Sequence, residues 1–143
     1  MARDDFSEKV KQLLCQQVGG KCAKPDCRIT TIGPHEITDK RTTIGVAAHI
    51  AAAAKGGPRF DELMSPKERK SVHNGIWLCQ SCSKLIDNDP VLFTVQKLHE
   101  WKCLAEKSAR NAIEFPNGKK ETLESDMSLY QFTDVLKNLE NRI

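Results

Sequence analysis

Apolar residues recur at spacings of three and four in two long stretches of the chain, and this period predicts amphipathic helices. The first helix is expected over residues 5–18, with Asp4 or Asp5 as its N-cap and Gly19 at its end. The second is expected over residues 95–115, with Thr94 as its cap.

Between these helices the pattern changes to that of short strands. Residues 42–50 are β-branched at first and apolar later, and residues 75–78 form a second short apolar run, so each predicts a strand. Residues 28–40 are polar and are broken by Gly33-Pro34, which favours an irregular segment.

Two shorter helices are expected next to the second strand. Ser65 followed by Pro66 predicts a helix start, and Glu68 is placed to close a capping box, so a helix is expected to about Val72. Another helix is expected from about Ser81 to Asp87. The combined pattern predicts a small α+β domain over residues 1–115.

The remaining residues predict a linker and a tail. Residues 116–125 contain Pro-Asn-Gly and charged positions, which indicates a linker. Residues 126–143 repeat apolar positions at three and four for about two heptads, fewer than the three or four that define a coiled coil. This C-terminal segment is predicted to be an association helix, and the alternative is a helix that packs back on its own domain.

Composition narrows the classes of partner only slightly. The chain has 143 residues with a formal net charge of +3, which neither proves nor excludes a nucleic-acid partner. Aromatic residues make up 6%, which argues against a stacking platform for single strands. One small core is feasible at this length, and a structural metal would help to stabilise it.

The start of the chain is charged and lacks the apolar region of a signal peptide. The longest apolar run, near residues 46–54, is too short to span a bilayer. We therefore expect a cytoplasmic protein with no membrane association. In that compartment the six cysteines are expected to be metal thiolates or buried thiols and not disulfides.

Four of the cysteines form two close pairs. Cys22 and Cys27 are separated by four residues, and about fifty residues later Cys79 and Cys82 are separated by two. Two such pairs fit a closed tetrahedral zinc site, in which zinc is structural because no position is open to substrate. The alternative is four buried free thiols.

Between and after the cysteine pairs lie two strands and a helix, with His49 on the first strand and Asn74 at the start of the second. This order resembles the HNH endonucleases, a family of ββα-metal nucleases on a treble-clef scaffold with a four-cysteine zinc site. Within the family it looks most like bacterial members associated with anti-phage defence. The matching stretches are GVAAHI (45–50), GGPR (56–59), ER (68–69) and NGIWLCQSC (74–82).

The resemblance implies a catalytic mechanism. A histidine like His49 would be the general base for the water that attacks the phosphodiester, and an asparagine like Asn74 would fix the loop and orient that histidine. A divalent cation, Mg²⁺ or Mn²⁺, would neutralise charge on the phosphate. The non-catalytic alternatives are a core histidine at position 49 and a turn residue at position 74.

The sequence departs from the family at both usual ligand positions for that cation. Ala48 precedes the histidine and cannot bind metal, and Ser83 stands where a histidine is usual. Asp87 lies four residues after Ser83, on the same helix face, and is the predicted ligand. Asp89 and His73 are further candidates. Asp87 has an equal alternative as the cap of the turn before Pro90.

Three cations are candidates for substrate contacts: Lys55, Arg59 and Arg69. Each would bind backbone phosphate, and the alternative is a surface salt bridge. No residue is suited to reading bases, so duplex DNA is expected to be cut with little sequence preference. The rivals to this nuclease are a catalytically weakened zinc module that binds DNA or a protein in a larger complex, and an adaptor that only assembles.

Overall fold

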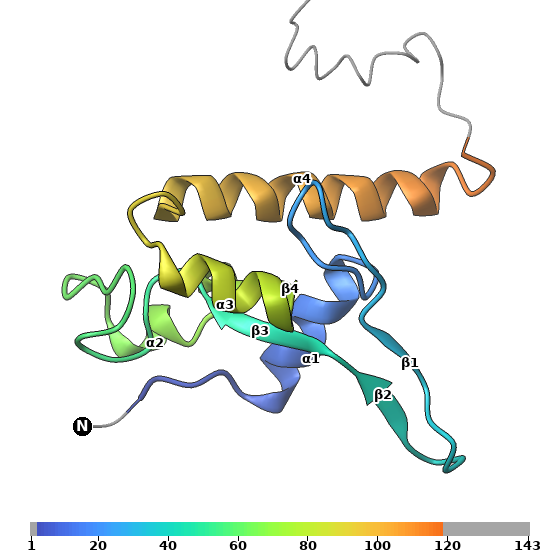
Figure 1. Ribbon diagram of the computed structural model, residues 1–143, viewed down its shortest axis with the longest axis horizontal. Helices are drawn as coiled ribbons and strands as arrows, with labels where there is room; N and C mark the ends of the chain where they lie inside the picture. Colours follow the sequence, from blue (N-terminus) through green and yellow to red (C-terminus); the bar gives the residue numbers. More distant parts are fainter. Residues whose placement is uncertain (1–2, 119–143) are drawn as a thin grey trace, which may run out of the picture. The chain divides into compact units, whose positions relative to one another are not determined.

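The computed structural model describes residues 3–118, which form an α+β fold of four helices, a short 3₁₀ helix and two small antiparallel sheets (Figure 1). The chain comprises two units that divide between Lys107 and Ser108, and all candidate site residues lie in the first. The predicted association helix 126–143 and most of the predicted linker 116–125 lie outside the described residues, so both stay predictions.

The fold is organised around a hairpin of two strands, β3 (Gly45–His49) and β4 (Gly75–Cys79). They pair antiparallel, with Gly45 opposite Cys79 and His49 opposite Gly75. All five residues of β4 are buried. Both glycines are required by close approach, because a Cβ at Gly45 would lie 2.2 Å from the Trp77 ring and one at Gly75 would lie 2.4 Å from Leu14.

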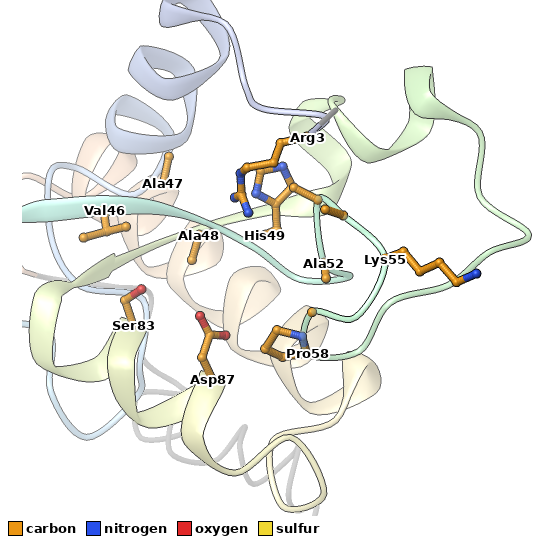
Figure 2. A pocket seen from close by; sticks show the side chains of 13 residues that line it. Arg3, Val46, Ala47, Ala48, His49, Ala52, Lys55, Pro58, Ser83 and Asp87 are labelled. Atoms are coloured by element: carbon orange, nitrogen blue, oxygen red, sulfur yellow. The ribbon is translucent and has the colours of Figure 1, made fainter. Parts of the chain in front are cut away.

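Helix α1 (Glu8–Gln17) and helix α3 (Gln80–Asn88) both pack against this hairpin. In Figure 2 they lie on opposite sides of β3. The core between these elements consists of buried apolar side chains from all of them. Its largest fully buried members are Leu14, Ile50, Ile76, Leu78, Ile86 and Leu98.

The N-terminal cap of α1 differs from the prediction. Ser7 is the N-cap, and its hydroxyl accepts a hydrogen bond from the Val10 backbone nitrogen at 3.2 Å. The predicted caps, Asp4 and Asp5, are wrong because the residues before Ser7 precede the helix. Asp4 instead forms an ion pair with Arg69, with 3.3 Å between its carboxylate and the guanidinium.

A second hairpin replaces the predicted irregular segment. Strand β1 (Ile32–Pro34) pairs with β2 (Arg41–Thr43), with Ile32 opposite Thr43 and Pro34 opposite Arg41. The prediction of one strand over 42–50 is also wrong, because the chain changes partners at Ile44, from β1 on one side to β4 on the other. The Gly33-Pro34 pair suggested a break, but Pro34 stands at the end of a very short strand, where a missing N–H is tolerated.

The remaining helices agree with the pattern. Ser65 and Glu68 form the predicted capping box at the start of α2 (Pro66–Arg69), although a 3₁₀ turn, η1 (Val72–Asn74), takes over after Arg69. Thr94 caps α4 (Val95–Glu114) by accepting from the Lys97 nitrogen at 3.2 Å. Among the helices of the described part, none is both long enough and apolar enough to cross a membrane.

Candidate functional site

The four paired cysteines converge on one point. Cys22 and Cys27 lie in the turn between α1 and β1, while Cys79 ends β4 and Cys82 lies in the first turn of α3. Their four sulfur atoms lie within 4.8 Å of one another, and the Cys27 and Cys79 sulfurs are 4.0 Å apart. This clustering confirms the predicted pairing of the two motifs in space.

The donor chemistry of the cluster is compatible with structural zinc. Zinc–sulfur bonds of about 2.3 Å in a tetrahedron place sulfurs about 3.8 Å apart, close to the separations found here. Burial raises the pKa of the Cys22 and Cys82 thiols. Without a cation these thiols therefore stay protonated, and a divalent metal would replace the protons by stabilising the thiolates.

A half-buried cation next to the cluster fits an anionic centre. Arg28 directly follows Cys27, and its Nε atom is buried without a hydrogen-bond partner among the described residues. Burial lowers the pKa of Arg28, and the charge of nearby Cys22 opposes that effect. Four thiolates around zinc carry a net negative charge, which would compensate this guanidinium.

His49 ends β3 and is half-buried beneath the segment that precedes α1. Its Nε2 atom lies 2.8 Å from the backbone oxygen of Asp4. Its ring stacks on Phe6, with 3.9 Å between ring centroids and 7° between planes. Burial, the largest cause, lowers the pKa of His49, so the neutral ring that a general base requires is favoured near neutral pH.

Asn74 holds the loop after His49 and not the imidazole itself. Its side-chain oxygen accepts from the Ala51 nitrogen and its amide donates to the Ala51 oxygen, both at 3.0 Å. The same amide donates to the Arg69 oxygen. Asn74 is buried, so these bonds fully commit its side chain. The predicted orientation of His49 is therefore indirect, through the backbone that follows the histidine.

A pocket of ≈ 310 Å³ counts His49, Ser83 and Asp87 among its lining residues. Figure 2 shows Ser83 and Asp87 reaching from α3 toward β3, with His49 beside Arg3 on the other side of the strand. Ala48 also lines the pocket and contributes only a methyl group. The metal-ligand positions implied by the family resemblance thus meet in space, but only one of them carries a carboxylate.

Asp87 is tied to a buried arginine. The Arg59 guanidinium lies 2.9 Å from the Asp87 carboxylate, with side-chain exposures of 4% for Arg59 and 50% for Asp87. Arg59 also donates to the backbone oxygens of Ile50 at 2.6 Å and Ile86 at 2.9 Å. Arg59 therefore links its own loop to the residue after β3 and to α3, and its guanidinium is engaged by groups within the protein. The alternative role of Asp87 as a turn cap belongs to Asp89, which accepts from the Leu92 nitrogen.

The other two predicted substrate contacts differ in exposure. Lys55 is exposed and lines the pocket. Arg69 is largely buried, with 12% of its side chain exposed, and pairs with Asp4 while it packs over the Phe60 ring. Of the three predicted cations, Lys55 alone is free to meet a phosphate at the pocket. The further metal candidate His73 packs beside His99 of α4, with ring centroids 5.1 Å apart.

Three residues at the site were not predicted as site residues from the sequence: Arg3, Asp4 and Phe6. Arg3 lines the pocket, and the other two contact the imidazole. Phe6 is an apolar position within the predicted helix 5–18, although it precedes α1 in the structure, and nothing in the sequence pattern directed it at His49. A scan against models of protein families finds no match for this chain, and a search of curated proteins finds none either.

Proposed function

We propose that this protein is a metal-dependent endonuclease of the HNH type that hydrolyses phosphodiester bonds in DNA. The observation that supports this function most directly is that His49, Ser83 and Asp87 line the same pocket. The order β3, β4, α3 around the four cysteines fits the ββα-metal arrangement on a treble-clef scaffold. In this reading the zinc cluster fixes the start of α3 and so places Ser83 and Asp87.

His49 is the proposed general base. A neutral imidazole accepts the proton of a water molecule as that water attacks phosphorus, and the lowered pKa keeps the ring neutral at the working pH. Asn74 is a positioning residue that fixes the loop after the histidine.

Asp87 and Ser83 are the proposed ligands of a catalytic Mg²⁺ or Mn²⁺. They supply one carboxylate and one hydroxyl, which are the hard oxygen donors that these cations prefer, and Mg²⁺ commonly takes its other ligands from water and substrate phosphate. When bound, the cation supplies charge neutralisation at the phosphate and the leaving oxygen. Arg59 holds the Asp87 carboxylate in place by the 2.9 Å ion pair.

The proposed substrate is duplex DNA bound through its backbone. Arg3 and Lys55 place two exposed cations on the pocket lining, and cations of this kind bind phosphate without reading bases. Little sequence preference follows from contacts of this type, and so does a strong dependence on salt.

Cleavage of supercoiled plasmid by the zinc-loaded protein tests this function. We expect nicking or linearisation with Mg²⁺ or Mn²⁺, loss of cleavage in EDTA, and a rate reduced by about 10²-fold or more in His49→Ala, since the general base is removed. His35→Ala is the matched control, because His35 is exposed and lies in the connection between β1 and β2, outside the pocket lining. Equal cleavage by His49→Ala and wild type would refute the proposal.

A second function is favoured by the incomplete ligand set. Ala48 offers no donor, and one oxygen of Asp87 already binds Arg59. A domain that keeps the zinc scaffold and docks on DNA or on a protein within a larger complex would fit these facts. A salt-sensitive gel shift without cleavage under any divalent cation would select this second function.

The family resemblance also implies a place in bacterial anti-phage defence, with residues 126–143 as an association helix. Sequence alone supports this part of the proposal. Light scattering of the full chain and of Leu136→Asp tests the association, because a charge in the apolar seam would dissociate an oligomer. An equal mass for both proteins, above that of a monomer, would exclude this segment as the interface.

A further inference from the structure

The residues before α1 are docked on His49 by several independent contacts. Asp4 bonds its backbone nitrogen to the Ala53 oxygen at 3.0 Å and pairs its carboxylate with Arg69 at 3.3 Å. Its backbone oxygen contacts the His49 ring, and Phe6 stacks on that ring. Side-chain exposures of 19% for Asp4 and 12% for Arg69 show that this anchor is sheltered from solvent.

The contact to Asp4 determines where the proton of the neutral imidazole resides. A carbonyl oxygen only accepts hydrogen bonds, so the Nε2 atom that lies 2.8 Å from it must be the donor. In a neutral ring the other nitrogen, Nδ1, then carries the lone pair. Stacking on Phe6 at 7° between planes fixes the rotation of the ring around this bond.

Nδ1 is also the ring nitrogen that the described part of the chain leaves without a hydrogen bond. It has no hydrogen-bond partner among residues 3–118, and His49 is only half-buried. His49 itself lines the pocket with Ser83 and Asp87. The nitrogen with the lone pair is therefore not engaged by any residue of the described part, and it belongs to a side chain that lines the pocket.

We infer that residues 3–6 are a working part of the active site, in which the Asp4 carbonyl holds His49 with its proton on Nε2 and so makes Nδ1 the basic nitrogen. The chemical part of this inference rests on the proposed function. As the oxygen of water forms its bond to phosphorus, a proton passes from that water to Nδ1. The bond from phosphorus to the leaving oxygen breaks, and that oxygen takes its electron pair and then a proton from solvent.

This assignment gives Arg69 and Asp4 a role that differs from those predicted from the sequence, which were a phosphate contact and a helix cap. They are positioning residues, because they act on the imidazole through the backbone of the docked segment. The asparagine assigned by the resemblance fixes the loop on one side of His49, and this segment fixes the ring itself. Two separate parts of the chain thus hold the backbone and the side chain of one residue.

Nitrogen-15 NMR of the histidine rings tests the tautomer without reference to catalysis. His35 is an internal reference, because its Nδ1 accepts from the Ile37 nitrogen, which also places its proton on Nε2, but on an exposed ring. At about pH 7.5 we expect an Nε2–H signal for His49 that exchanges with water at least about tenfold more slowly than that of His35. A proton on Nδ1, or equal exchange at both residues, would overturn the inference.

Two conservative variants then test the positioning role in the full chain. Phe6→Leu keeps an apolar side chain but removes the stacked ring, and Asp4→Asn removes the charge that pairs with Arg69. Each is expected to speed exchange of the His49 Nε2–H and to lower kcat about tenfold with little change in KM, since substrate binding is untouched. Glu8→Gln, which neutralises an exposed carboxylate paired with Lys11, is the matched control and is expected to match wild type.

The outcomes separate this inference from the proposed function. Faster exchange with an unchanged kcat would refute the positioning role while the nuclease stands. A wild type that cleaves no phosphodiester would refute the nuclease and with it the chemical part of the inference, while the His49 tautomer is still decided by NMR.

Discussion

The cysteine cluster and the His49 pocket are neighbours on α3, yet they are built in different ways. The cluster uses four side chains of one type, three buried and one half-buried, whose sulfur atoms lie close enough together to hold one metal ion. The pocket draws on the N-terminal segment, β3, the following loop and α3, and much of its polar chemistry is already satisfied within the protein. If the cluster holds structural zinc and the pocket is the proposed active site, changes at the cluster should act mainly on stability and changes at the pocket mainly on cleavage.

The largest effect is expected at the cluster. Cys79→Ser removes one thiolate of four, and because metal binding is coupled to folding in small zinc domains, we expect loss of bound zinc and of cooperative thermal unfolding. Circular dichroism and metal analysis by mass spectrometry measure both. Cys103→Ser, on an exposed position of α4, is the control and is expected to change the unfolding free energy by about 0.5 kcal/mol or less. Normal folding of metal-free Cys79→Ser would show that the cysteine cluster is not needed for stability, and the proposed difference between the two regions would be lost.

A smaller effect on stability is expected at the edge of the pocket. Arg59→Ala leaves buried carbonyl oxygens and Asp87 without their donor, so the unfolding free energy in urea is expected to fall by about 2–4 kcal/mol. Arg3→Ala is the matched control, because its pair with Asp5 is 62% and 63% exposed and such surface pairs contribute about 0–1 kcal/mol. Similar losses in the two variants would show that Arg59 does not tie the pocket together.

The smallest effect concerns the pH dependence of cleavage. Burial lowers the pKa of His49 from its ordinary 6.5, Arg3 lowers it further, and Asp4 and Asp5 oppose both; Lys55 and Asp87 share the same pocket. Only the neutral ring accepts a proton, so kcat/KM should rise with pH around a midpoint that lies below the ordinary pKa of histidine. Arg3→Gln should move the midpoint upward, because it removes a cation that disfavours the imidazolium. A midpoint above 6.5 in wild type would contradict the assignment.

The sequence was a good guide where chemistry is local. The capping box at Ser65 and Glu68, the helices around them and the cysteine pairs follow from spacing within a few residues, and all are present in the structure. The β1–β2 hairpin was missed because its strands are three residues long and one ends in proline.

The pocket was predicted less well, since its contacts join distant parts of the chain. Arg59 was expected to reach substrate, but nothing near it in sequence shows that Ile50 and Ile86 would present their carbonyls to it. The same holds for Asp4, which looked like a helix cap and lies against His49 instead. Local patterns predict the helices, the strands and the two cysteine pairs. Long-range hydrogen bonds decide which charged side chains are left to contact a ligand.

The most direct test of the account is a double-mutant cycle on the rate of DNA cleavage under single-turnover conditions, with the zinc-loaded wild type, His49→Ala, Asp87→Asn and the double variant. If both residues serve one reaction in one pocket, each single change lowers the rate and the double variant is no slower than the slower single variant, because groups that act as a unit are not additive. The account would be contradicted if the rate losses of the two single variants multiply in the double variant, or if either single variant retains the wild-type rate.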